Sequence, residues 1–188
     1  MKNGRIFVIS APSGSGKTTI CKKVLKKVKS LTPSVSVTTR RPRKGEKNKR
    51  DYYYVSRRSF KEKIKKGSLL EWEENFGYFY GTPKRFAIAE LKKGKNLLLS
   101  IDVKGAMQVK KKFPESTLIF IRPPSFKELS RRLTSRNTDK PREIARRLKI
   151  AKAELKFMPK YNYAVTNDKL ENAILKVVSI IKKESKTE

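Results

Sequence analysis

Residues 6–20 read IFVISAPSGSGKTTI, and they constrain the fold more than any other part of the chain. The apolar, β-branched run Arg5–Ser10 predicts a buried strand. After the glycine-rich turn, Ile20, Val24 and Val28 recur at helical spacing. A strand, a glycine-rich turn and a helix, in this order, form the context in which backbone N–H groups cradle phosphate. The stretch therefore predicts an α/β protein that binds a nucleotide.

The loop departs in one place from the pattern G-x-x-x-x-G-K-[ST]. It ends in Gly16, Lys17 and Thr18 as expected, but Ala11 stands where the first glycine falls, and Gly14 is extra. We expect the two glycines to take the positive-φ positions and Ala11 to keep a negative φ at the strand exit. Lys17 is expected to reach the β- and γ-phosphates, and the Thr18 hydroxyl to bind Mg²⁺. A glycine-rich turn with a chance lysine is the alternative.

The rest of the chain alternates strands with helices. Leu97–Ile101, Thr117–Ile121 and Tyr163–Thr166 are further apolar strand candidates, which favours a parallel sheet with right-handed crossovers. Short alternating and aromatic runs between Ser34 and Phe79 surround one short helix, Phe60–Lys66, and indicate a small mixed or antiparallel insertion.

Two helix starts carry specific signals. Ser125 followed by Glu128 has the spacing of a capping box. Thr82–Pro83 predicts a helix with a threonine N-cap and a proline at its first position.

Composition narrows the chemistry. The 188 residues include no histidine and one cysteine, Cys21, which excludes the commonest general base and makes a zinc site or disulfide framework untenable. A mean hydropathy of −0.66 and the lack of a long apolar run argue against a membrane span. The N-terminus lacks the apolar core of a signal peptide, so we expect a cytoplasmic location.

The charge is extreme, with 48 Lys and Arg against 17 Asp and Glu and a formal net charge of +31. Such a field attracts polyanions, so nucleic acid is a conceivable partner. We favour solvated lysine-rich faces instead, because the basic residues spread over every segment rather than forming one stripe.

A second candidate site lies in the segment SVTTRRPR, followed shortly by Asp51 and Tyr52. Arg40 and Arg43 flank a proline-stiffened turn and could clamp one phosphate, with a hydroxyl from Tyr52. Taken alone, the same segment also fits a basic surface loop.

Seven segments together resemble guanylate kinase: SAPSGSGKT, SVTTRRPRKGE, RDYYYV, EWEENFGYFYGT, IDVKGA, IRPPS and VTND. The resemblance runs from Ile6 to the last helix. It implies Mg²⁺-dependent transfer of the γ-phosphate of ATP to GMP, giving ADP and GDP. It also implies a core of residues 1–33, 97–125 and 158–188, a GMP-binding insertion with its connecting helix at 34–96, and a lid at 126–157.

The resemblance assigns the nucleotide sites residue by residue. ATP would be bound by Ser13, Gly14, Ser15, Gly16, Lys17, Thr18, Thr19 and Asn167, with the metal on Thr18. GMP would be bound by Ser36, Arg40, Arg43, Tyr52, Glu71, Tyr80, Thr82 and Asp102. The catalytic charges would be Lys17, Arg132, Arg136 and Arg147, whereas Arg131, Arg142 and Arg146 have no such match.

The assignment of Glu71 is chemically sound. Guanine presents N1–H and a 2-amino group as parallel donors to one carboxylate, whereas adenine leaves that carboxylate badly paired. A strand-edge salt bridge is the alternative for Glu71, and core packing is the alternative for Tyr52 and Tyr80. The acceptor is an anionic phosphate oxygen, so the reaction needs no general base and fits a chain without histidine.

Two departures from the family pattern stand out. Ser100 precedes Ile101 and Asp102 where the family reads D-I-D, and we expect this serine, or a water, to replace the missing carboxylate with weaker Mg²⁺ binding. Asn137 stands where glycine is common after the lid arginine, and asparagine tolerates left-handed backbone geometry.

Three alternatives remain open at this stage. A non-catalytic interaction module related to these kinases would usually have a damaged phosphate loop, and the loop ending in Lys17 and Thr18 is intact. A basic phosphate-loop protein that binds nucleic acid is prompted by the charge. A kinase acting on a ribose phosphate would not need Glu71. We expect a monomer or a weak dimer.

Overall fold

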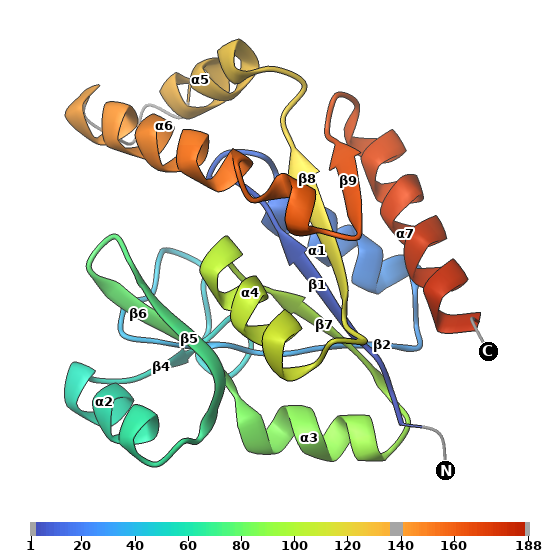
Figure 1. Ribbon diagram of the computed structural model, residues 1–188. Coiled ribbons are helices and arrows are strands. Elements are labelled where there is room, and N and C mark those ends of the chain that lie inside the picture. Colours follow the sequence, from blue (N-terminus) through green and yellow to red (C-terminus); the bar gives the residue numbers. More distant parts are fainter. Residues whose placement is uncertain (1–2, 136–140, 187–188) are drawn as a thin grey trace. The chain divides into compact units, whose positions relative to one another are not determined.

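A computed structural model of the chain describes residues 3–135 and 141–186, and Figure 1 labels its helices and strands. In chain order these elements are β1 (Ile6–Ser10), α1 (Lys17–Lys27), β2 (Leu31–Pro33), β3 (Val37–Thr38), β4 (Tyr53–Tyr54), α2 (Arg57–Lys65), β5 (Leu69–Asn75), β6 (Tyr78–Pro83), α3 (Lys84–Lys92), β7 (Asn96–Ser100), α4 (Val103–Lys112), β8 (Thr117–Arg122), α5 (Phe126–Thr134), α6 (Pro141–Leu155), the short 3₁₀ helix η1 (Met158–Lys160), β9 (Tyr163–Thr166) and α7 (Leu170–Lys186).

The larger sheet has the strand order β2-β7-β1-β8-β9, and the pairs β2·β7, β1·β8 and β8·β9 are parallel. Every residue of β1 is buried, as is typical of a strand in a parallel sheet flanked by helices. The α/β fold with a parallel sheet is therefore confirmed.

The smaller sheet has the order β4-β3-β6-β5. The β3·β4 pair is parallel, whereas β3·β6 and β5·β6 are antiparallel, so the predicted small insertion is a mixed sheet. Its core is a cluster of Val37, Phe60, Leu69 and Phe79, in which the rings of the two phenylalanines stack 5.3 Å apart.

The chain forms two compact units. Unit 1 comprises the first six residues, Ser30–Leu99 and Lys104–Ser116; unit 2 comprises Phe7–Lys29, Ser100–Val103 and Thr117–Glu188. The phosphate-loop candidate lies in unit 2, and the arginine-rich segment with the smaller sheet lies in unit 1.

The helices of unit 2 pack through the apolar positions of their sequences. In Figure 1, α5 and α6 lie side by side, and Leu129, Leu133 and Ala151 form their shared core. Helix α7 packs against β9 and α1. Across the described residues, no helix combines the length and the apolar character needed to cross a membrane.

The two predicted helix starts have different outcomes. The Ser125 hydroxyl accepts the Glu128 N–H at 3.0 Å, which confirms that cap. The prediction for Thr82–Pro83 is wrong, because α3 begins at Lys84 with Pro83 as its N-cap residue. Thr82 still belongs to β6, and its hydroxyl is used across the sheet instead of at a helix end.

Candidate functional sites

The loop between β1 and α1 is shaped by two glycines. Gly14 and Gly16 have φ of 91° and 90°, whereas Ala11 is buried and is not among the described non-glycine residues with positive φ. A Cβ at Gly16 would lie 2.6 Å from Nδ2 of Asn167, so this position excludes a side chain for steric reasons as well. The expectation that Ala11 leaves the demanding backbone positions to the glycines is confirmed.

Asn167 fixes this loop from the end of β9. Its side-chain Nδ2 donates to the carbonyl oxygen of Ser15 at 2.8 Å, and its backbone N–H donates to Arg122 O at 2.9 Å. Asn167 and Ser15 are both buried, so these hydrogen bonds are shielded from water. The residue that sequence comparison assigned to ATP thus holds the backbone of the loop.

Lys17 extends from the first turn of α1 to the carboxyl end of β7. Its Nζ lies 2.7 Å from Asp102 Oδ1 and 2.9 Å from Ile101 O, and the side chains of Lys17 and Asp102 are 19% and 28% exposed. Asp102, predicted to contact guanine, therefore lies in unit 2 with the loop lysine. The other residues predicted for GMP lie in unit 1.

Ser100 is exposed at the end of β7, and Cys21 is buried on α1. Burial raises the pKa of the Cys21 thiol, and the Ser100 hydroxyl and the charge of Lys17 oppose that rise. Ser100 thus places a neutral hydroxyl two residues before Asp102, at a position where a carboxylate would add a second negative charge.

Glu128 orders the arginines of α5. Arg131 and Arg132 donate to its carboxylate at 2.7–2.8 Å and hold the pKa of Glu128 down at about 2. Arg132 also donates to the carbonyl oxygen of Asn167 at 3.0 Å, which directs its guanidinium toward the end of β9. Sequence reasoning found Arg132 but gave Glu128 only a capping role.

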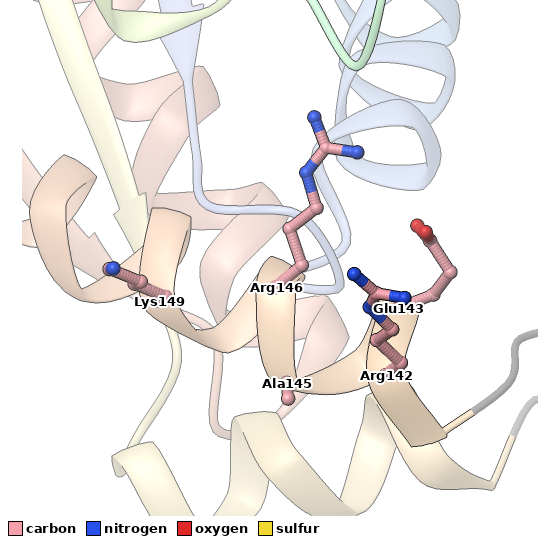
Figure 2. A pocket seen from close by; sticks show the side chains of 5 residues that line it. All are labelled: Arg142, Glu143, Ala145, Arg146 and Lys149. Atoms are coloured by element: carbon pink, nitrogen blue, oxygen red, sulfur yellow. The ribbon is translucent and has the colours of Figure 1, made fainter.

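The remaining predicted arginines lie on or before α6. Arg147 is half-buried on this helix, whereas Arg136 lies outside the described residues, as does Asn137. A pocket of about 520 Å³ on α6 is lined by Arg142, Glu143, Ala145, Arg146 and Lys149, whose side chains are drawn in Figure 2. These side chains are exposed, as the sequence predicted for Arg142 and Arg146.

In unit 1, a buried carboxylate lies between β5 and β6. Glu71 is 2% exposed, and its Oε1 accepts the hydroxyl proton of Thr82, which is fully buried, at 2.7 Å. The strand register shifts by one residue between Leu69 and Trp72, so Glu71 lies in a bulge of β5. A buried, oriented carboxylate in a bulge is suited to bind a pair of hydrogen-bond donors.

An arginine-rich cluster lies on the loop after β3. Nη2 of Arg40 donates to both carboxylate oxygens of Glu46 at 3.0 Å. The same carboxylate accepts hydrogen bonds from the backbone N–H of Arg43 and from the Tyr54 hydroxyl, each at 2.8 Å. Partial burial favours a raised pKa, but these hydrogen bonds prevail and hold the pKa of Glu46 below its usual value. Burial and the bond to Glu46 raise the pKa of Tyr54 to about 12.

Sequence reasoning missed both Glu46 and Tyr54. A usable signal exists for Glu46, because it is the first acidic residue of the chain and follows a run of basic residues that includes Arg40 and Arg43. Tyr54 is one of three consecutive tyrosines, and nothing in the sequence separates it from its neighbours.

Two predicted tyrosines accompany Arg40. The Arg40 guanidinium lies 5.4 Å from the ring centre of Tyr52, and the Tyr52 and Tyr80 rings are 6.2 Å apart. Tyr80 also hydrogen-bonds to Arg40.

Arg43 is exposed and Ser36 is half-buried at the start of β3. Except for Asp102, the predicted GMP residues therefore lie in one unit, on the smaller sheet and its loop.

The chain is similar to guanylate kinases along nearly its whole length. A sequence model of guanylate kinase matches residues 3–184. The guanylate kinase of Caldanaerobacter subterraneus subsp. tengcongensis is 46% identical over 180 residues, covering 96% of this chain and 87% of that protein. The guanylate kinase of Clostridium tetani is 45% identical over 184 residues, covering 98% and 88%.

A solved structure agrees as well. The crystal structure of guanylate kinase from Anaplasma phagocytophilum matches with a TM-score of 0.84 and 34% identity, over all of this chain and 89% of that one. Similarity of sequence and of fold therefore extends over both units.

Proposed function

The chain belongs to the guanylate kinase family, and from this premise we propose that its two units hold ATP and GMP through the residues described above. The family transfers the γ-phosphoryl group of ATP to GMP. One oxygen of the GMP phosphate attacks the γ-phosphorus, a new P–O bond forms, and the bond to the bridging oxygen breaks as ADP takes the electron pair. What is specific to this chain is the assignment of its residues to these tasks.

The observation that carries the proposal is the Glu71–Thr82 pair. A carboxylate that is 2% exposed and held by a hydroxyl at 2.7 Å has a defined orientation before any ligand arrives. We assign it to N1–H and the 2-amino group of guanine, with Ser36 as a further contact of the base. A kinase for a ribose phosphate would have no use for such a group.

We assign the phosphate of GMP to the cluster of Arg40, Arg43, Tyr52 and Tyr80. The Arg40 guanidinium already donates hydrogen bonds to both oxygens of the Glu46 carboxylate at 3.0 Å. An incoming phosphate, with its larger charge, shares or displaces this carboxylate. Glu46 therefore keeps Arg40 oriented while the phosphate site is empty.

We assign the phosphates of ATP to the loop residues Ser13–Thr19. Gly14 and Gly16 have positive φ, and α1 begins directly after them at Lys17. A loop of this kind and the N-terminus of a helix both direct backbone N–H groups toward an anion. Asn167 acts by holding the carbonyl of Ser15. Lys17 exchanges its contact with Asp102 for the β- and γ-phosphates when the donor binds. The role of Asp102 toward guanine stays a prediction.

We assign stabilisation of the transferring phosphoryl group to positive charge. Lys17, Arg132 and Arg147 would meet the charge that develops in the transition state, and Arg136 joins them as a prediction outside the described residues. Glu128 and the carbonyl of Asn167 already direct Arg132. Because the acceptor oxygen is anionic, the chain needs no general base.

Mg²⁺ fits the donor set at the loop. The Thr18 hydroxyl on α1 and the Ser100 hydroxyl on β7 are exposed oxygen groups in the same unit, and Mg²⁺ prefers oxygen ligands, several of them water and phosphate. We propose Thr18 as the protein ligand, and the metal would supply charge neutralisation on the phosphates.

A coupled assay of ADP release from ATP tests the proposal, with GMP, AMP, UMP and ribose phosphates as acceptors. We expect clear preference for GMP, by roughly 10⁴-fold over AMP if both guanine donors are read. Similar rates with several acceptors would contradict the assignment of Glu71. No transfer with any acceptor would favour the non-catalytic interaction module.

Three further predictions concern the whole protein. A monomeric or weakly dimeric state, a cytoplasmic location and basic faces that are solvated rather than bound to nucleic acid rest on the sequence, the last in spite of its charge of +31. A salt-dependent gel shift with nucleic acid tests the third: lack of binding near 0.15 M salt would exclude a nucleic-acid partner, and binding at that salt would contradict the prediction.

A further inference from the structure

The bulge that carries Glu71 interrupts the regular hydrogen bonding of β5. Leu69 pairs with Pro83 and Trp72 pairs with Gly81, so β5 has one residue more than β6 over this interval. A bulge redirects a side chain and leaves part of the backbone ladder unpaired. The position of Glu71 therefore depends on contacts other than the β5·β6 ladder.

Two side chains of α4 make such contacts on both sides of Glu71. Gln108 Nε2 donates to Trp72 O at 2.7 Å, and its Oε1 accepts the Trp72 N–H at 3.3 Å. Lys112, one helical turn later, donates to Leu70 O at 2.6 Å. The backbone immediately before and immediately after Glu71 is thus bound by one face of α4, and all these residues lie in unit 1.

The geometry of β5 explains why these bonds matter. Strand β5 is the last strand in the sheet order, so its outer edge offers backbone groups that the sheet itself does not pair. The Gln108 amide reproduces the donor and acceptor of a neighbouring strand at Trp72. Lys112 adds a charged donor, whose hydrogen bonds are stronger than those of neutral donors.

The opposite side of the bulge is held by Gly81 of β6. A Cβ at Gly81 would lie 2.9 Å from Glu71 O and 3.1 Å from Trp72 Cβ. The bulged backbone therefore presses against β6 at a residue without a side chain, and α4 holds it from the outer edge. Glu71 is confined from both sides.

We propose that Gln108 and Lys112 are positioning residues for recognition of the acceptor base, acting through the backbone that flanks Glu71. The inference rests on the proposed role of Glu71 as the reader of guanine. Loss of either contact lets the bulge shift, so that the carboxylate meets one guanine donor well and the other poorly. The consequence is weaker discrimination of the 2-amino group rather than loss of phosphoryl transfer.

The test compares steady-state kinetics with GMP and with IMP, which keeps N1–H but lacks the 2-amino group. Gln108→Leu removes both hydrogen bonds at similar volume, and Gln108→Glu keeps the acceptor but removes the donor. Lys112→Met removes the charged donor, and Lys112→Arg retains one. Lys111→Met is the matched control, an exposed lysine adjacent on the same helix.

We expect Gln108→Leu and Lys112→Met each to raise KM for GMP by about 5- to 10-fold, with kcat changed less than twofold. The ratio of kcat/KM for GMP to that for IMP should fall, while Lys112→Arg and Lys111→Met stay near wild type. Gln108→Glu serves if the leucine variant does not fold, and it should show an intermediate rise in KM.

Glu71→Gln is measured in parallel to separate the two ideas. If Glu71→Gln lowers the GMP-to-IMP ratio but the Gln108 and Lys112 variants keep both that ratio and KM, the positioning role is overturned and the proposed function stands. A fall in kcat alone in those variants also overturns it. If Glu71→Gln leaves the ratio unchanged, the proposed reader of guanine is wrong and this inference falls with it.

Discussion

The proposed donor loop of unit 2 and the proposed acceptor site of unit 1 are built in different ways. The loop is suited to bind an anion through backbone N–H groups of consecutive residues, shaped by positive φ at Gly14 and Gly16. The acceptor site consists of side chains held by other side chains: Glu71 by Thr82 of the neighbouring strand, and Arg40 by Glu46 of the same loop. A backbone site tolerates a change such as Ala11, whereas a side-chain site depends on each carboxylate.

The largest effect is expected at the loop, from Lys17→Ala. Removal of the ammonium takes away the charge assigned to the β- and γ-phosphates, so kcat should fall by about 10³-fold or more. The thermal midpoint should change little, because the Lys17–Asp102 contact is partly exposed. Coupled ADP release and a melting curve provide the measurement.

Lys26→Ala is the control for Lys17, since it removes an exposed lysine from the last turn of the same helix. It should retain wild-type turnover. A wild-type rate in Lys17→Ala would show that the loop is not the donor site.

The next largest effect is expected at the acceptor base, from Glu71→Gln. The substitution replaces an acceptor of two guanine donors by an amide that accepts only one, so kcat/KM for GMP should fall about 10²- to 10³-fold. The rate with AMP should change much less. Glu74→Gln alters an exposed carboxylate of the same strand and should match wild type. Equal losses with GMP and AMP would contradict a role in reading the base.

Much of the donor site could be predicted from sequence because its information is local. Strand, glycine turn and helix follow one another within residues 6–20, and their order limits the backbone to one geometry. The buried strands of the parallel sheet also follow from apolar runs. The Thr82–Pro83 helix start failed because the cross-strand bond to Glu71 keeps Thr82 in β6.

The phosphate clamp of Arg40, Arg43 and Tyr52 could be proposed from its own segment, but the guanine contacts Ser36, Glu71 and Thr82 were assigned only through family resemblance, because they are scattered along the sequence. Periodicity does not predict the bulge at Glu71, because one extra residue in β5 depends on how β6 and α4 pack against it. The contact of Asn167 with Ser15 joins residues 152 positions apart, and no local signal encodes it.

A smaller effect is expected from Glu46→Gln, and it depends on pH. Hydrogen bonds hold the pKa of Glu46 below its usual 4.5, so the carboxylate stabilises the fold above that pH and loses this effect as pH falls through its lowered pKa. At pH 7 the variant should be less stable by about 1–2 kcal/mol, since it weakens charge-assisted bonds to Arg40 and Tyr54. Urea unfolding of the wild type and of Glu46→Gln between pH 7 and pH 3 measures their free energies of unfolding.

The difference in free energy of unfolding between wild type and Glu46→Gln should become smaller as the pH is lowered. Glu62→Gln is the control, because Glu62 forms an exposed pair with Arg58 within one helix. A constant difference across the pH range would contradict the ionic role of Glu46. The variant should also raise KM for GMP about fivefold, which corresponds to a loss of about 1 kcal/mol in binding free energy.

The smallest effect is expected at Ser100, where the metal rather than the nucleotide is measured. Ser100→Asp adds a second carboxylate near Asp102, and higher ligand charge strengthens binding of a hard cation. The apparent affinity for Mg²⁺ in the coupled assay should rise about three- to tenfold. Ser100→Asn, polar but uncharged, controls for loss of the serine hydroxyl. If both variants keep the wild-type Mg²⁺ dependence, Ser100 has no part in the metal site. A rise in Ser100→Asp alone would show that side-chain charge, and not only backbone geometry, sets the strength of the donor site.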